Sequence, residues 1–319
     1  MKKRTNAWPS VSVTAMVAFF LMFGVTPATP ADSWTFVSID VPGAVWTLAR
    51  HSTPSGAVVG TYKWGPAGWQ TRGYLLTPDG FRDISHTAFG RRVDVRGTNS
   101  RGDVVGQTSD PAKFLPVYSH GFLLRKGKVI WIDPPPGQCP ATTCETIPMD
   151  INENGDIVGF YAAYDLPDYE NYSEHGFLWS HGVFTTVDAT PLGATLTNAR
   201  GINPDGDIVG LYSEFGYNGP FHGFLRRYDG TFTAIDVPGA IGTSANAINP
   251  GGQIVGDYTT PDWIVHGFLL SEGNYTLFDY PDAVETYPFG ISANGWIVGF
   301  YFESSGALHG FLVSREGLE

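Results

Sequence analysis

Six near-copies of one short motif occur along this chain at nearly equal intervals. The tripeptide Ile-Val-Gly or Val-Val-Gly begins at residues 58, 104, 157, 208, 254 and 297, with spacings of 46, 53, 51, 46 and 43 residues. A second motif, His-Gly-Phe-Leu, begins at residues 120, 175, 222, 266 and 309, and Arg-Gly-Tyr-Leu replaces it at residue 72. Self-similarity at a period of about 20–50 residues indicates a repeat architecture, so each period should be one structural unit.

Each unit contains four short segments with the character of strands. In the fifth unit we predict strands at about 244–249, 253–258, 266–270 and 275–279, with Gly-containing turns inside the two hairpins. Such turns use Gly because tight hairpins need positive φ. The 40 glycines and 14% aromatic residues also favour strands over helices. Six four-stranded units predict an all-β, six-bladed β-propeller. A β-solenoid is the alternative, but its repeats usually carry fewer and shorter strands.

The sixth unit ends before a fourth strand, and a strand without a partner stands near the N-terminus. Residues 36–40, Phe-Val-Ser-Ile-Asp, have the sequence of a fourth strand but no third strand precedes them. We predict that this segment, about 34–40, completes the last blade. Closing the ring in this way would remove two free sheet edges.

The histidines of the repeated motif are predicted to be structural. Counting outward from the outer hairpin turn places the motif histidine opposite an aspartate in units two to five, with one extra turn residue in unit four, and the predicted closure places His309 opposite Asp40. In the first unit both members change together, to Arg72 and Ser85. A bond across the hairpin would satisfy two polar groups that burial would otherwise penalise. The alternative, a ring of acid/base dyads, is disfavoured because active sites rarely need one dyad per blade. The predicted pairs are His120–Asp133, His175–Asp188, His222–Asp236, His266–Asp279 and His309–Asp40.

The N-terminus has the layout of a secretory signal peptide at residues 1–31. Lys2, Lys3 and Arg4 precede an apolar stretch at 11–25 and then small residues. A membrane anchor is the alternative, but the apolar run is short for a span. We therefore expect a secreted or periplasmic, monomeric protein, with residues 32–319 forming one propeller domain and no membrane span. Cleavage removes three cations and no acid, which moves the formal net charge from −12 to −15 and argues against nucleic acid as a partner.

The two cysteines, Cys139 and Cys144, are predicted to form a disulfide, since an exported chain can keep one and further metal ligands are lacking nearby. We expect no cofactor and no metal. Calcium at the acidic turn residues Asp103, Asp156 and Asp207 is a weak alternative, because D-x-D-x-D spacing is absent.

The connections between strands fall on two faces. The turns inside the first–second and third–fourth hairpins share one side, here called the turn face, and are uniform and short. The other connections share the opposite side, here called the loop face, and are long and varied. Loops on a rigid scaffold commonly carry binding residues, although the rings could instead pack the loops together. The candidate ligand-binding residues are Trp64, Trp69, Tyr118, Tyr164, Asp165, Asp168, Tyr169, Phe215, Tyr217, Asp262, Trp263 and Glu303.

One position of the first strand carries arginine in three units. Arg50, Arg96 and Arg200 occupy it, and Met149, Asn246 and Phe289 fill it elsewhere. Because the first strand of a blade is innermost, three guanidinium groups near the axis could bind an anion such as a uronate or a phosphate. The alternative is that they pair with local acids.

The full repeat, A-x-x-I-N-x-x-G-x-I-V-G-x-Y followed by H-G-F-L and F-T-x-I-D-x-P-G-A, resembles the HAF family of bacterial extracellular repeat proteins over about residues 34–314. The resemblance implies export and a repeat fold but supplies no reaction. The first unit, through Arg72 and Ser85, and the cysteine insertion depart from the pattern.

The sequence favours binding over catalysis. It contains no G-x-S-x-G, H-E-x-x-H, P-loop or C-x-x-C motif, and no catalytic residue can be assigned. We expect a secreted, non-catalytic binding protein for an extracellular ligand, with carbohydrate the favoured class. A polysaccharide hydrolase or lyase is one alternative, with acid/base pairs such as Asp165 with Asp168 or Asp262 with Glu303. A protein-interaction platform fits the fold equally well.

Overall fold

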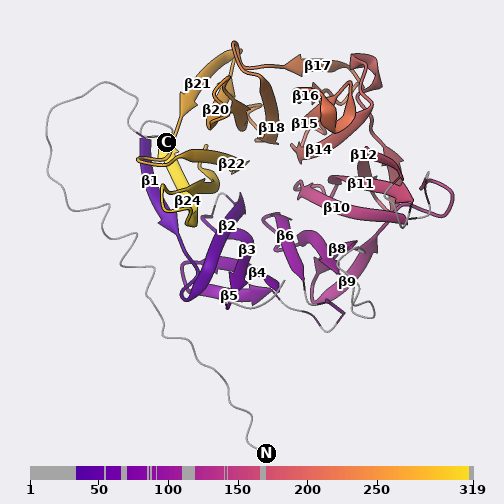
Figure 1. The fold of residues 1–319 in the computed structure, drawn as a ribbon. Helices are drawn as coiled ribbons and strands as arrows, with labels where there is room; N and C mark the ends of the chain where they lie inside the picture. The colour runs from indigo at the N-terminus through magenta and orange to yellow at the C-terminus, as the bar shows by residue number, and fades with distance from the viewer. Residues whose placement is uncertain are drawn as a thin grey trace, which may run out of the picture.

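Six sheets stand around a common axis in the computed structural model (Figure 1). It describes residues 34–315 except 54, 66–69, 85, 87, 91, 110–118, 140, 142 and 166–169, and only the backbone at 170, 171 and 315. The predicted signal peptide lies outside the described residues. Each sheet has four strands in antiparallel order, which confirms the six-bladed β-propeller.

The strands follow the repeats closely. Blade 1 contains β2 (Ala44–Ser52), β3 (Val58–Trp64), β4 (Thr71–Thr77) and β5 (Gly80–Ile84), and blade 2 contains β6 (Val93–Thr98), β7 (Val104–Ser109), β8 (Ser119–Arg125) and β9 (Lys128–Ile132). Blade 3 contains β10 (Thr143–Ile151), β11 (Ile157–Asp165), β12 (Glu170–Ser180) and β13 (Val183–Thr186), and blade 4 contains β14 (Leu196–Ile202), β15 (Ile208–Ser213), β16 (His222–Arg226) and β17 (Phe232–Ile235). Blade 5 contains β18 (Gly242–Ile248), β19 (Ile254–Thr259), β20 (Val265–Ser271) and β21 (Asn274–Phe278), and blade 6 contains β22 (Glu285–Ile291), β23 (Ile297–Phe302), β24 (Leu308–Arg315) and β1 (Trp34–Ile39). Two short 3-10 helices, η2 (Thr190–Leu192) and η3 (Gly216–Asn218), lie in connections.

The N-terminal strand closes the ring. β1 pairs antiparallel with β24, so that Ile39 lies opposite Gly310 and Val37 opposite Leu312. The first and last described strands are therefore neighbours (Figure 1). The closure predicted from the incomplete last repeat is confirmed.

The glycines of both motifs are required by close approaches. A Cβ on Gly256, of the Ile-Val-Gly motif, would lie 1.9 Å from the carbonyl oxygen of Ser244 and 2.9 Å from the ring of Phe268. A Cβ on Gly267, of the His-Gly-Phe motif, would lie 2.8 Å from Pro288 in the next blade. Backbone and neighbouring blade come this near only where a side chain is absent, which explains why both glycines recur.

The apolar core is divided among the spaces between blades. Six clusters of buried side chains each join one blade to the next. The motif phenylalanine belongs to them, and Phe268, Phe224 and Phe311 have no exposed surface. Each blade is therefore stabilised mainly by its neighbours, as expected when a four-stranded sheet cannot bury both faces alone.

Asparagines at the turn face also join successive blades. The side-chain amide of Asn99 donates to the carbonyl of Asn152 at 3.3 Å, and that of Asn152 donates to the carbonyl of Asn203 at 3.0 Å. Asn249 donates in the same way to Ser292 of blade 6 at 3.2 Å. The side-chain oxygen of each asparagine accepts a backbone N–H group of its own turn. One residue therefore both caps its turn and bonds to the neighbouring blade.

Candidate functional site

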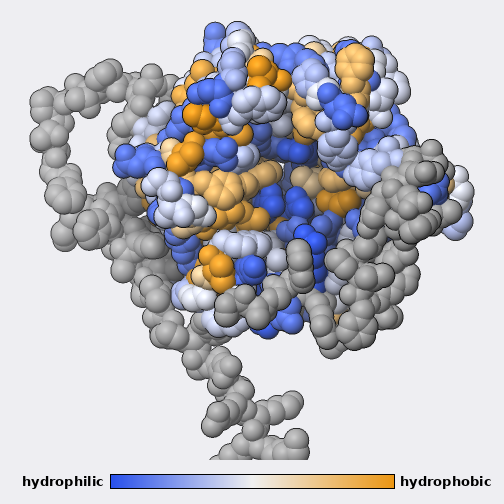
Figure 2. Space-filling view, viewed as in Figure 1, coloured by the Kyte–Doolittle hydropathy of each residue, from blue (hydrophilic) through white to orange (hydrophobic). Residues whose placement is uncertain are grey.

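A cavity at the axis is lined by residues from all six innermost strands. Its lining includes every member of the predicted column and three residues that follow column members. The cavity is partly open to solvent, and the space-filling view shows a hollow at the centre of the ring where hydrophilic and hydrophobic surface meet (Figure 2). The lining residues are Arg50, His51, Arg96, Met149, Asp150, Arg200, Asn246, Ala247 and Phe289.

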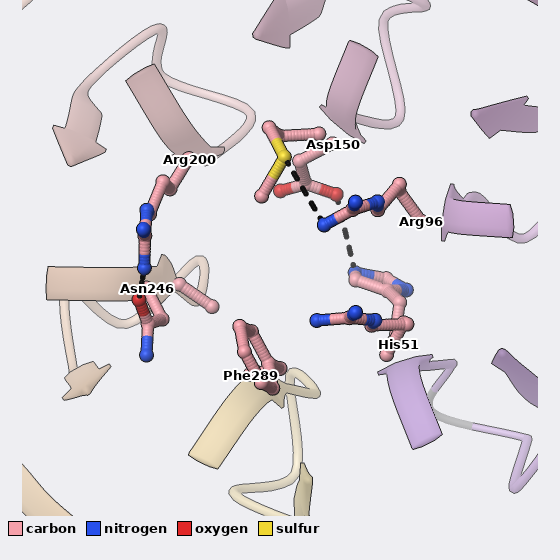
Figure 3. A pocket seen from close by; sticks show the side chains of 9 residues that line it. His51, Arg96, Asp150, Arg200, Asn246 and Phe289 are labelled. Atoms are coloured by element: carbon pink, nitrogen blue, oxygen red, sulfur yellow. Dashed lines mark hydrogen bonds and ion pairs between the residues drawn. The ribbon is translucent and has the colours of Figure 1, made fainter. Parts of the chain in front are cut away.

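A β-bulge directs each column residue toward the axis. In every innermost strand the register shifts by one residue at the column position; in β18, for example, Ala245 lies opposite Gly256 and Ala247 opposite Val255, which leaves Asn246 as the extra residue. The same shift occurs in β2, β6, β10, β14 and β22. A bulge bends its strand and re-aims a side chain. Repeated six times, it brings six side chains into one cavity, and Figure 3 shows several of them entering from different strands.

The three arginines of the column have different partners. Arg96 Nη2 lies 2.7 Å from Asp94 Oδ2, which is an ion pair. Arg200 Nη1 instead donates to the neutral amide oxygen of Asn246 at 2.6 Å. The guanidinium of Arg50 lies over the ring of Phe289, 4.3 Å from its centroid, a cation–π contact. Within the described part of the chain, neither Arg50 nor Arg200 has a carboxylate at ion-pair distance.

Burial changes the ionisation of these groups. Desolvation, followed by the charge of Arg96, lowers the pKa of Arg50 to about 9. Desolvation also lowers the pKa of Arg200, although Asp257 partly offsets it. Burial alone would raise the pKa of Asp94, but the guanidinium groups of Arg96 and Arg50 hold it below its usual value. At neutral pH Arg50 therefore remains a cation and Asp94 remains ionised.

A histidine and an aspartate lie next to the column. His51 Nε2 from β2 is 3.6 Å from Asp150 Oδ1 of β10, across the blade between them. The Asp150 carboxylate accepts backbone N–H groups of Ile151 at 2.8 Å and Ile202 at 3.1 Å. Burial raises its pKa, and His51 partly opposes that rise. Asp150 therefore connects blades 3 and 4, and it lines the same cavity as the arginines.

An aromatic wall on blade 6 runs from the cavity along the strands β22 and β23. The ring of Phe289 lies 5.4 Å from that of Phe300, and the ring of Phe300 lies 4.6 Å from that of Tyr287, both nearly parallel. The hydroxyl of Tyr287 donates to Glu285 at 2.9 Å. Since β22 begins at the loop face, the wall extends from the arginines toward that face.

A cluster of tyrosines surrounds a buried carboxylate at the loop face, between blades 3 and 4. Glu174 of β12 is only 3% exposed. It accepts hydrogen bonds from the hydroxyls of Tyr172, at 2.6 Å, and Tyr217, and from the amide of Asn198 on β14. The ring of Tyr164 lies parallel to that of Tyr172, with centroids 6.2 Å apart. Burial and then the Glu174 carboxylate raise the pKa of Tyr172 and of Tyr217, so both hydroxyls keep their protons.

The structure brings only some predicted loop residues together. Tyr164 and Tyr217 both join the Glu174 cluster. Tyr164 is buried, and its hydroxyl donates to Glu145 at 3.0 Å. Asp165 ends β11 beside them. Trp69, Tyr118, Asp168 and Tyr169 lie outside the described residues, so the Asp165–Asp168 pair stays a prediction.

The other predicted loop residues are distributed over four blades. Trp64 ends β3, with its ring edge toward Tyr62, and Phe215 lies exposed in blade 4 next to η3. Trp263 is exposed in blade 5 and has a positive φ of 66°. Asp262 accepts from Thr260 at 2.5 Å, while Glu303 of blade 6 lies 3.6 Å from His309. Asp262 and Glu303 thus have separate local partners.

All five histidine–aspartate pairs are present between the two outer strands of their blades. The histidine Nδ1 lies 2.8–2.9 Å from a carboxylate oxygen in each. In four blades the histidine ring also lies against a tyrosine of the second strand, stacked in three of them, as His175 is on Tyr161, and tilted in blade 4. In blade 1, Arg72 lies 3.6 Å from Asp83, while Ser85 lies outside the described residues. Cys139 and Cys144 are disulfide-bonded.

Sequence reasoning missed His51, Asp150, Tyr172, Glu174 and Asn198. Asn198 stands two residues before Arg200, so the period of a strand could have placed it on the same side. Glu174 directly precedes the motif His175, in a position that varies between repeats. No short-range signal joins Glu174 to Asn198, because they belong to different blades.

Neither a metal-binding cluster nor a membrane-spanning helix is found among the described residues. Among the described residues, no group of three or more His, Cys, Asp or Glu side chains is arranged to hold a metal ion. Across the same part of the chain, no helix is long and apolar enough to cross a membrane.

Comparison with known proteins identifies the fold. No family model matches the chain, so the resemblance to the HAF family stays a prediction, and no curated protein matches it. Similar solved structures include a protein of unknown function from Dyadobacter fermentans, with 13% identity, 90% of this chain and 100% of that chain covered, and a TM-score of 0.56. A TolB-like protein from Agrobacterium tumefaciens has 14% identity, covers 89% and 98%, and has a TM-score of 0.53. A lectin from Aleuria aurantia in complex with α-methyl-L-fucoside has 12% identity, covers 89% and 93%, and has a TM-score of 0.51. At these identities the likeness shows the fold alone.

Proposed function

We propose that this chain is a secreted or periplasmic, non-catalytic binding protein that holds a carbohydrate at the loop face. The proposal rests on the buried carboxylate of Glu174, to which Tyr172, Tyr217 and Asn198 all donate hydrogen bonds. Because Glu174 fixes the hydroxyls, the rings of Tyr172 and Tyr217 are held in place while they remain 43% and 57% exposed.

This combination suits a sugar. A sugar ring offers an apolar face and a rim of hydroxyls, so it needs a flat aromatic surface next to fixed polar groups. The phenolic oxygens of Tyr172 and Tyr217 can still accept hydrogen bonds from ligand hydroxyls, since their protons are engaged by Glu174. Pre-ordered rings also lower the entropy cost of binding.

The proposed location rests on two features of the chain. The disulfide between Cys139 and Cys144 suits an oxidising compartment, and the basic and then apolar N-terminus suits export. We also propose membership of the HAF family, because its recurring motif positions have defined roles in this fold, such as the close approach at Gly256. The Aleuria aurantia lectin shows that a protein of similar fold binds a sugar, which supports the capacity of the fold and no specific ligand.

A glycan array with the purified protein, followed by calorimetry on the best glycan, tests the proposal. We expect Tyr217→Ala to weaken binding about tenfold, because it removes a ring contact of about 1.4 kcal/mol. The matched control is Tyr228→Ala, since Tyr228 is an exposed tyrosine in the β16–β17 turn on the opposite face. Binding of no glycan by the wild-type protein, or equal loss in both variants, would refute the proposal.

A further inference from the structure

Two of the three arginines at the axis have no carboxylate at ion-pair distance among the described residues. Three arginines line one cavity, and only Arg96 has an ion-pair partner among the described residues, Asp94. Arg200 is bonded to an amide and Arg50 lies against an aromatic ring. Two guanidinium groups thus share one cavity, and neither is in direct contact with a carboxylate of the described residues.

The same groups retain unused hydrogen-bonding capacity. The Nε atoms of Arg50, Arg96 and Arg200 are buried and have no hydrogen-bond partner among the described residues. A buried donor without an acceptor costs about 1–3 kcal/mol, and this arrangement repeats it three times. An oxyanion would supply the acceptors and the negative charge together.

The rest of the lining indicates that the anion is part of an organic molecule. Met149, Ala247 and Phe289 contribute apolar surface to the cavity, and Phe289 begins the stacked wall that continues through Phe300 and Tyr287. A free inorganic anion would gain nothing from this wall. A carboxylate attached to a ring would use the guanidinium fork and the apolar wall at once.

We propose that Arg50 and Arg200 bind the carboxylate of an acidic ligand at the axis of the ring, and that this ligand is a uronic acid sugar. That the ligand is a sugar rests on the proposed function, whereas the carboxylate site itself does not. Strand β14 connects the two regions, because Asn198, which donates to Glu174, stands two residues before Arg200. A uronate could thus place its acid group at the arginines and its hydroxyls toward the tyrosine cluster.

The test is a titration of the purified protein, followed by NMR, with methyl glucuronide, methyl glucoside and benzoate. We expect the glucuronide to bind about tenfold or more tightly than the glucoside, as one charge-assisted contact implies. Arg50→Gln should remove that preference by the same factor, and Arg200→Gln should reduce it. Arg82→Gln is the matched control, because Arg82 is exposed on the outer strand β5, and it should bind as the wild type does.

Each outcome decides between the two proposals. Equal binding of the glucuronide by wild type and Arg50→Gln, with native circular dichroism, overturns the carboxylate site. Binding of benzoate that depends on Arg50, with neither glycoside bound, supports the site and refutes the sugar. Failure to bind any carboxylate, alongside Tyr217-dependent binding of a neutral glycan, overturns the site and leaves the proposed function standing. If Arg50→Gln does not fold, Arg50→Lys keeps the charge without the fork and should bind with intermediate affinity.

Discussion

The polar groups that recur from blade to blade and those that line the axial cavity differ in how fully they are satisfied. The motif histidines each lie within 2.9 Å of a carboxylate oxygen, and turn asparagines such as Asn152 bond to the next blade. The three axial arginines, in contrast, keep Nε atoms without a partner in the described structure.

This difference separates stability from binding. A satisfied buried polar group contributes to a single folded state, whereas an unsatisfied one costs free energy. Local conflicts that a sequence retains are commonly found at functional sites. The repeated positions should therefore determine whether the ring folds, and the axial positions should determine what it holds.

The largest expected effect is at a repeated core position. Phe268→Ala removes a fully buried ring from the interface between blades 4 and 5 and should lower the free energy of unfolding by about 4 kcal/mol. Phe215→Ala removes the same side chain from an exposed position on the loop face and should change it by less than about 0.5 kcal/mol. Chemical denaturation measures both. Similar losses would mean that the loop face is part of the core.

The sequence was sufficient to predict the ring because each repeated position has one cause that acts in every blade. The close approaches at Gly256 and Gly267 select glycine, and the incomplete last repeat requires the strand at Trp34–Ile39. Such constraints leave a periodic trace, so blade number and closure could both be read from the spacing.

The site was predictable only in part, because it depends on contacts between unlike blades. Alignment of the repeats placed Arg50, Arg96 and Arg200 in one column. It could not reveal the bulges that turn the column inward, since they follow from strand register. Nor could it join Glu174 to Asn198, because the two residues come from different blades and neither recurs.

The next effect should have the opposite sign. Arg50→Met replaces an unpaired guanidinium with an apolar side chain of similar length and should raise the free energy of unfolding by about 1 kcal/mol at pH 7. Desolvation lowers the pKa of Arg50 to about 9 in the folded protein, below its value of about 12.5 or more in the unfolded chain. The folded state thus binds this proton less tightly, and wild-type stability at this residue should rise with pH above about 9.

Denaturation of wild type and Arg50→Met at pH 7 and pH 10 measures both parts of this expectation. The stability difference should be largest at pH 7 and smaller at pH 10. A variant that is less stable than wild type at pH 7 would mean that the charge of Arg50 is compensated by the protein itself, and the contrast with the repeated positions would fail.

The smallest expected effect compares two histidine–aspartate pairs that differ in chain connectivity; His309 also lies 3.6 Å from Glu303. His309–Asp40 and His266–Asp279 have the same 2.9 Å separation and nearly the same exposure, but the first joins residues 269 apart and the second residues 13 apart. Double-mutant cycles should give about 0.5 kcal/mol for each, because the pairwise contact is local and partly solvated.

Hydrogen exchange should distinguish the two pairs. β21 follows β20 through a tight turn, whereas β1 has no such link to β24, so His309→Ala should accelerate exchange in β1 by about twofold and His266→Ala should accelerate exchange in β21 less. Equal acceleration in both strands would show that the closing strand is held as firmly as one inside a hairpin.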